Sequence, residues 1–286
     1  MIVNDACGGS TAPYLNTGGK NQCTPKPIRS YALAKTNFSF ASVAASKTKA
    51  AWDTAKENKD IVIFWDIEEF AQNNTEATKK EGRFADYPLK AGVRGLNVTH
   101  YLSDCSYNAL ESYSDSTDYT RIFRILTDEN FTAIVNEDGS VQGEPVSNFS
   151  VGVLTDATDE TPQNTEVQIK FANNTKSNIK PEFDLITYEG IYGVDLEVGT
   201  TSGTEIKVKA LAGCSGTAIT SLEDGDFVVK DSGGGTESIS FTAADADGYY
   251  TLTGTGFVTG HTVELAGVVV KSNVMYEDSG VVAITV

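Results

Sequence analysis

The chain has 286 residues, 40% of them hydrophobic, and its 39 acidic against 22 basic residues give a formal net charge of -17. This length and apolar content suffice for two domains with buried cores and exclude wholesale disorder. The acidic balance excludes a nucleic-acid groove built on basic contacts, because phosphate binding needs Lys and Arg to replace counterions. It also argues against an anionic membrane surface as a partner.

The charge is unevenly distributed along the chain. Residues 1–100 contain 13 basic and 10 acidic residues, whereas residues 101–286 contain 9 basic and 29 acidic residues. The near-neutral N-terminal segment and the strongly acidic remainder of the chain indicate two regions that face different surroundings. The alternative explanation is that the acidic surface serves only to keep the protein soluble.

The first 35 residues are expected to form an extended N-terminal arm. They are rich in Gly, Pro, Asn and Thr and have few large apolar side chains, so this stretch cannot bury enough surface to fold alone. The sequence shows no basic stretch followed by an apolar run and no window of the ~18–20 apolar residues that a membrane helix needs. We therefore expect no export signal, no membrane anchor and synthesis in the cytoplasm.

Residues 36–198 are expected to form a β-rich domain with two short helices. The first helix is predicted over residues 42–56, where alanine is frequent and apolar side chains share one face. Trp52 is expected to anchor this helix in the core, and Ser42 or Ser39 to cap its start. The other predicted elements are a helix over residues 104–113 and strands over 61–65, 92–102, 120–127, 132–135, 141–143, 149–154, 167–171 and 183–192.

A polar segment of mixed charge at residues 66–95 is long for a connection between two strands. Loops of more than ~12–15 residues inside a compact domain are usually functional or disordered. We expect this loop, like the arm, to gain structure by docking on neighbouring molecules. Its candidate inter-subunit contact residues are Glu76, Lys79, Lys80 and Arg83.

A Gly/Thr/Ser-rich segment at residues 199–204 predicts a linker to a second domain. Beyond it, residues 205–286 contain short strands at ~8–12-residue spacing, which is typical of an Ig-like β-sandwich. The predicted strands are 205–211, 227–230, 238–242, 249–253, 261–265 and 281–286. The fold class is therefore mainly β, with a sandwich- or tube-type domain, one or two flanking short helices and a C-terminal Ig-like sandwich.

Motifs for catalysis, cofactors and metals are weak. His100 and His261 are the two histidines, and both lie in strand-like segments, where a surface or hydrogen-bonded His is more common than a general base. The Asp-rich turns around Asp224 and Asp245 lack the acidic residue at the twelfth position of a calcium loop. We therefore expect no enzyme, no cofactor and no metal site.

The four cysteines, at positions 7, 23, 105 and 214, form no Cys-x-x-Cys pair, which argues against zinc and thioredoxin chemistry. Cys7 and Cys23 could form a disulfide in an oxidising setting. Because no export signal is predicted, reduced and inert thiols are the favoured interpretation.

This set of parts resembles the major tail tube protein family of tailed bacteriophages. The matching parts are the helix at 42–56, the loop at 66–95, the strands between Leu96 and Tyr192 and the module after Gly203. The resemblance rests on architecture and includes no short diagnostic motif. It implies a β-sandwich with a flanking helix, a long loop that reaches adjacent subunits and a C-terminal Ig-like domain.

On this resemblance, we expect a virion structural protein made in the host cytoplasm. It would assemble with itself, as hexameric rings stacked into a tail tube, and with other virion proteins. Genomic DNA would pass through the tube without specific binding. Two alternatives stay open, a capsid-decorating or head-fibre protein and a bacterial surface adhesion module.

A tube that conducts DNA must not hold it, and a wall of carboxylates repels the duplex within about 8–10 Å at physiological salt. We therefore expect part of the acidic charge to face the channel. The candidate lumen-facing residues are Asp128, Glu129, Glu137, Asp138 and Glu144. The alternative is a solvated acidic exterior.

Overall fold

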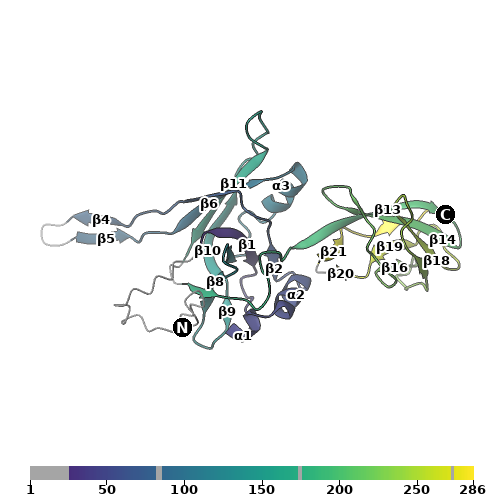
Figure 1. Cartoon of the computed structure of the whole chain (residues 1–286), viewed down its shortest axis with the longest axis horizontal. Helices are drawn as coiled ribbons and strands as arrows, with labels where there is room; N and C mark the ends of the chain where they lie inside the picture. Colours follow the sequence, from purple (N-terminus) through teal and green to yellow (C-terminus); the bar gives the residue numbers. More distant parts are fainter. Residues whose placement is uncertain (1–25, 82–85, 173–175, 272–273) are drawn as a thin grey trace. The chain divides into compact units, whose positions relative to one another are not determined.

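The computed structural model of this chain shows a mainly β fold (Figure 1), which confirms the predicted fold class. The residues that it describes are 26–81, 86–172, 176–271 and 274–286. The chain divides into two compact units, Met1–Tyr188 and Glu189–Val286, and each has its own hydrophobic core. Within the described residues, no helix combines the length and the apolar character that crossing a bilayer requires.

A ten-stranded sheet organises the first unit. Its main path runs β12-β8-β7-β10-β11-β6-β3, with β1, β2 and β9 paired beside it, and every pairing is antiparallel. Its strands are β1 (Ile28–Ala34), β2 (Ile61–Ile63), β3 (Glu69–Gln72), β6 (Gly95–Tyr101), β7 (Arg121–Leu126), β8 (Phe131–Val135), β9 (Val141–Gln142), β10 (Glu144–Val151), β11 (Asn164–Phe171) and β12 (Ser177–Ile179).

Strand β1 corrects the prediction of an arm over residues 1–35. It pairs with β2 and with β7, and Tyr31, Leu33 and Ala34 within it are fully buried. The sequence of a strand that is buried on both faces is an unbroken apolar run without alternation. The Gly- and Pro-rich residues before it dominate the composition of the segment and conceal that run. The part of the predicted arm up to residue 25 lies outside the described residues.

Alternate residues of β1 and β7 supply two cores on opposite faces of the sheet, as the strand period of two requires. Ala32 and Phe123 belong to one core, whereas Leu33 and Ile122 belong to the other. The buried Leu110 of helix α3 (Asp104–Glu111) is part of the second core. The Ser103 hydroxyl caps α3 by accepting a hydrogen bond from a backbone N–H of the first turn at 3.4 Å.

Two short helices, α1 (Val43–Ser46) and α2 (Lys49–Glu57), replace the single helix predicted over residues 42–56. The Ser42 hydroxyl caps α1 by accepting a hydrogen bond from a backbone N–H of the first turn at 3.1 Å. Trp52 of α2 is fully buried, as predicted, and its indole N–H donates to a carbonyl of α1 at 2.9 Å. Its ring packs against those of Phe40, Phe123 and Phe131.

The segment predicted as a loop at residues 66–95 is largely a two-stranded β-structure. Strand β3 pairs with β6 in the sheet, and the pairing continues outward through Thr75 and Val93 to strands β4 (Thr78–Glu81) and β5 (Asp86–Lys90). Every side chain of β4 is exposed. Figure 1 shows these two strands projecting beyond the sheet. We call residues 73–94 the ribbon.

The second unit is a β-sandwich. A sheet in the order β17-β18-β14-β13-β21-β20, with β15 beside β14, and a sheet in the order β16-β19-β22 share one core. Strands β13 and β21 pair in parallel, and the other pairings are antiparallel. Its strands are β13 (Ile191–Thr201), β14 (Glu205–Ala212), β15 (Ala218–Ile219), β16 (Phe227–Lys230), β17 (Ser240–Thr242), β18 (Tyr249–Thr253), β19 (Thr262–Leu265), β20 (Val269–Lys271), β21 (Val274–Asp278) and β22 (Val282–Ala283).

The boundary between the units lies earlier than predicted. Residues 199–204, the predicted linker, contain the end of β13 and the turn that leads into β14. The units instead divide after Tyr188. The strand predicted over residues 183–192 is absent up to Gly190. A tight hairpin turn and a flexible linker share a Gly/Ser/Thr composition, so composition alone does not distinguish them.

We expect each unit to fold separately when the chain is divided after Tyr188. The fragments 1–188 and 189–286 keep their cores intact, so each should unfold in one cooperative transition. A fragment of residues 202–286 loses β13, which contributes the buried Val194 and Leu196 to the sandwich core, and should be unfolded. Thermal melts followed by circular dichroism check this, and equal stability of the two C-terminal fragments would contradict the boundary.

Candidate functional site

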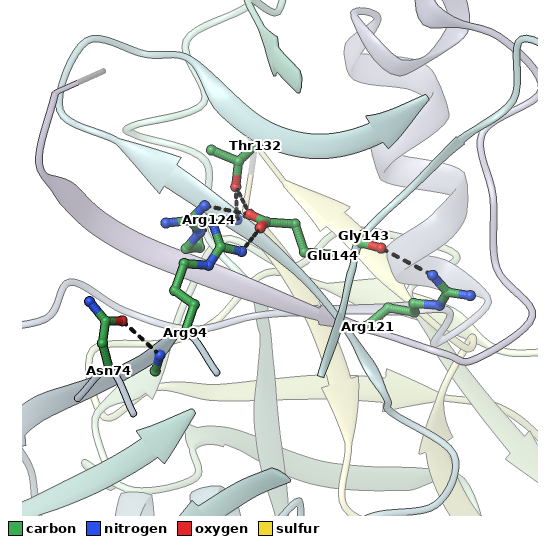
Figure 2. Close-up of polar contacts among 8 residues, drawn as sticks. Asn74, Arg94, Arg121, Arg124, Thr132, Gly143 and Glu144 are labelled. Carbon is green, nitrogen blue, oxygen red and sulfur yellow. Dashed lines mark hydrogen bonds and ion pairs between the residues drawn. The ribbon is translucent and has the colours of Figure 1, made fainter. Parts of the chain in front are cut away.

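A buried ion-pair network lies where the ribbon joins the sheet (Figure 2). Glu144, the first residue of β10, is fully buried and accepts two hydrogen bonds from Arg124 of β7, at 2.6 and 2.8 Å. The same carboxylate accepts a hydrogen bond from Thr132 of β8 at 2.5 Å and is ion-paired with Arg94, the last ribbon residue. Three strands and the ribbon therefore meet at one carboxylate. We call these four residues the root network.

The aromatic ring of Phe171 lies against both guanidinium groups. Its centroid is 4.1 Å from Cζ of Arg94 and 5.1 Å from Cζ of Arg124, which is within the range of cation–π attraction. The Phe171 N–H also donates to the Arg94 carbonyl at 2.9 Å. Arg94 is thus held by its side chain and by its backbone, and this fixes the chain where the ribbon enters β6.

The two strands of the ribbon approach closely at its base. The Asn74 side-chain oxygen accepts a hydrogen bond from the Gly95 N–H at 3.1 Å, and the Asn73 N–H donates to the Gly95 carbonyl at 2.9 Å. A Cβ atom on Gly95 would lie 2.4 Å from the Asn73 carbonyl oxygen. Only glycine permits this approach, so the ribbon base depends on Gly95.

The root network keeps its carboxylate ionised although it is buried. Burial opposes ionisation of Glu144, but the Arg124 and Arg94 guanidiniums and the Thr132 hydroxyl outweigh that effect and hold its pKa below the ordinary value. Burial lowers the pKa of Arg124, which nevertheless stays cationic. Burial and the two guanidiniums lower the pKa of the neighbouring Lys176 to about 8, although Glu144 opposes this shift. The surroundings of Glu144 are therefore rich in positive charge.

Glu144 corrects one of the lumen-facing predictions. It was a candidate for the channel wall because it is acidic, yet its side chain is buried inside the first unit against two arginines. Its partners Arg124 and Arg94 stand 20 and 50 positions away in the sequence. No local pattern reveals such a pairing, so the sequence analysis missed both arginines.

The other four lumen candidates are solvent-accessible but are not brought together. Asp128 and Glu129 lie in the turn between β7 and β8, whereas Glu137 and Asp138 lie in the turn between β8 and β9. These turns stand at opposite ends of β8, a strand of five residues that spans ~17 Å. That these carboxylates line a channel stays a prediction.

The candidate contact residues of the predicted loop lie on the ribbon. Glu76, Lys79 and Lys80 are all exposed, the two lysines on β4. Arg83 lies outside the described residues. The three described candidates therefore belong to one projecting element.

The described cysteines are oxidised. Cys105 in α3 and Cys214 after β14 are each in a disulfide, and no described cysteine is free. The interpretation as reduced thiols concerned Cys7 and Cys23 and stays a prediction. Cys7 and Cys23 lie outside the described residues. Disulfides persist in oxidising settings such as cell and virion surfaces.

Both histidines are buried side chains. His100 of β6 has its Nε2 atom 2.9 Å from the Tyr31 hydroxyl, and burial lowers its pKa to about 4. His261 lies just before β19 and is buried as well. In the described parts of the chain, no three or more His, Cys, Asp or Glu side chains form a group that could hold a metal ion.

Comparison with models of known protein families finds no match to this chain, and comparison with curated proteins finds none either. The ribbon and its root network are therefore interpreted from their own geometry.

We expect Glu144→Gln to destabilise the first unit by about 3–5 kcal/mol, because it leaves the buried guanidinium of Arg124 and the partly buried one of Arg94 without their carboxylate. Both tryptophans, Trp52 and Trp65, lie in this unit, so tryptophan fluorescence during urea unfolding reports on it alone. The matched control is Glu129→Gln. Glu129 is exposed and forms an ion pair at 3.7 Å with a lysine that is exposed as well. Loss of this exposed pair should lower the free energy of unfolding by less than about 1 kcal/mol. Equal urea midpoints for Glu144→Gln and Glu129→Gln would contradict the stabilising role of Glu144.

Acid should weaken the first unit through the same carboxylate. Because folding lowers the pKa of Glu144, its ion pairs contribute stability that is fully present above the ordinary carboxyl pKa of 4.5 and is lost as the pH falls through the folded value. The melting temperature of the parent protein, followed by fluorescence, should therefore fall more steeply below about pH 4.5 than that of Glu144→Gln. Parallel profiles would show that Glu144 does not contribute to the acid response.

Proposed function

We propose that this protein is a structural subunit of a tailed-phage virion that assembles with itself into the stacked rings of a tail tube. The observation that carries the proposal is the ribbon. An isolated two-stranded β-structure is only marginally stable in water. A ribbon whose strand β4 is exposed along its whole length therefore gains stability by docking on another molecule.

The ribbon is long enough to reach a neighbouring subunit. The nine residues from Asn73 to Glu81 span ~30 Å at the rise of an antiparallel strand, which is about the diameter of a small domain. A projection of this length can cross the face of an adjacent copy.

The root network gives the ribbon a fixed direction. Arg94 ties the ribbon to Glu144, and Glu144 is held in turn by Arg124 and Thr132 of two sheet strands. Fully connected buried polar networks rigidify the parts that they join. An assembly arm requires this property, because a subunit contact at the far end depends on the orientation set at the base.

Strand β3 offers a second contact for assembly. Among the described residues it pairs only with β6, so its other edge carries backbone groups that can pair with another chain. Phe70 on this strand is 44% exposed, and the nearby Trp65 is 39% exposed. An open edge with large apolar side chains supports sheet continuation between copies.

Removing the ribbon should abolish assembly and leave a folded protein. We would replace residues 76–92 with an Asn-Gly turn, which connects the paired Thr75 and Val93 as a two-residue hairpin. Electron micrographs of the purified parent protein should show stacked rings, and the shortened variant should stay monomeric with unchanged tryptophan fluorescence. Glu137→Gln, an exposed change in the β8–β9 turn, is the control that should still assemble.

Two results would contradict the proposal. The shortened variant could form the same rings as the parent, in which case the ribbon has no role in assembly. The parent could instead form isolated trimers or pentamers, which would favour a capsid-decorating protein.

A further inference from the structure

The partly exposed Trp65 lies beside a buried histidine. Trp65 belongs to residues 64–68, which connect β2 to β3 and which we call the β2–β3 connection. It is 39% exposed, and its ring centroid lies 5.7 Å from that of His100 in an edge-to-face arrangement. His100 itself is fully buried. Trp65 is therefore part of the cover that separates the His100 imidazole from water.

Uncharged groups surround the His100 ring within the sheet. Its Nε2 atom lies 2.9 Å from the hydroxyl of Tyr31, which is fully buried in β1. Its cross-strand neighbour on β11 is Thr165, which is buried as well and whose hydroxyl donates to the Gly152 carbonyl at 2.9 Å. A neutral imidazole has one donor and one acceptor nitrogen, whereas the imidazolium has two donors and a charge. These surroundings therefore favour the neutral ring.

The charged side chains on the elements around His100 do not pair with it. Asp66 of the β2–β3 connection forms an ion pair with Arg29 of β1 at 2.8 Å, and Glu68 is exposed. Glu166 of β11 lies on the opposite face of the sheet, because it follows the residue that pairs with His100. A proton on the enclosed ring would thus create a buried cation without a carboxylate, which costs free energy.

Two backbone hydrogen bonds hold the end of the β2–β3 connection on the sheet. The Ile67 N–H donates to a carbonyl of β1 at 2.8 Å. The Glu68 N–H donates at 3.0 Å to a carbonyl of β6, from the residue that precedes His100. Strand β3 begins with the next residue, Glu69. The contacts beside His100 therefore also fix the start of the open β3 edge.

We propose that His100 is an acid-sensitive latch for the β2–β3 connection. While the ring is neutral, it keeps Trp65 and the start of β3 packed on the sheet. When it takes up a proton from solvent, the ring becomes hydrated and the connection detaches. The latch is a property of the single chain, so it is independent of the assembly proposed above.

The direction and the size of the effect follow from the two protonation equilibria. A hydrated His100 in the detached state has the ordinary pKa of 6.5, whereas burial lowers its pKa to about 4 in the closed state, although a backbone hydrogen bond with Asp66 opposes this shift. The stability of the closed state is therefore fully present above about pH 6.5 and is lost as the pH falls toward 4. Between pH 7.5 and pH 5.0, the population of the detached state should rise about 30-fold.

Hydrogen exchange of backbone amides, followed by NMR, measures this population. The protection factors of the Ile67 and Glu68 N–H groups, corrected for the intrinsic pH dependence of exchange, should be about 30-fold lower at pH 5.0 than at pH 7.5. The Phe40 N–H, which donates to the Val141 carbonyl at 2.9 Å in the core on the other face of the sheet, should change by less than about twofold. This internal control separates detachment from unfolding of the whole unit.

Removing the titrating ring tests the cause. His100→Gln keeps a polar atom for the Tyr31 hydroxyl but takes up no proton, so protection of Ile67 and Glu68 should change by less than about twofold between the two pH values. The matched control is His261→Gln, which replaces the buried histidine of the second unit and should keep the change of about 30-fold. Tryptophan fluorescence at pH 7.5 checks that the first unit of each variant is folded.

Two results would overturn the latch. One is equal protection of Ile67 and Glu68 in the parent protein at the two pH values, and the other is an equal pH response in the parent and in His100→Gln. The first result needs no variant, so it applies even where His100→Gln does not fold. Either result would leave the proposed function intact, whereas a parent protein that forms no rings would overturn the proposed function and leave the latch.

Discussion

The buried carboxylate of Glu144 imposes a constraint on which the first unit depends. An ionised carboxylate taken out of water costs several kcal/mol unless close cations and hydrogen bonds compensate for it. Here the compensation comes from Arg124 and Thr132 on neighbouring strands and from Arg94 at the base of the ribbon. The same requirement that keeps the carboxylate ionised therefore joins the ribbon to the sheet, and a ribbon that changed direction would remove one of the two guanidiniums paired with this charge.

This arrangement separates two tasks in one unit. The cores on either face of β1 and β7 stabilise the sheet, and strands β3 and β4 contribute little to that stability because their side chains are exposed. Elements that are only marginally stable in isolation are stabilised when another molecule covers them. After Tyr188 the chain forms a second unit with a core of its own. The β-sandwich of this unit contains no strand from the first unit.

Local signals predicted much of the secondary structure, whereas long-range pairing decided the rest. The cap at Ser42 and the strand at residues 249–253 are predicted from local signals, and the structure confirms both. Strand β4 of the ribbon lacks alternation because the side chains on both of its faces are exposed, so its sequence is typical of a loop. The partners of Glu144 lie far apart in the chain, and the interior position of β1 depends on its pairing with β2 and β7. Nothing within a short window carries that information.

A cryo-electron microscopy reconstruction of particles assembled from the 286-residue chain tests whether the ribbon joins neighbouring copies. We expect stacked rings in which residues 73–94 of each copy leave their own sheet beside Arg94 and lie on the adjacent copy. A reconstruction in which these residues fold back on their own subunit, or point into solvent away from every neighbour, would contradict it.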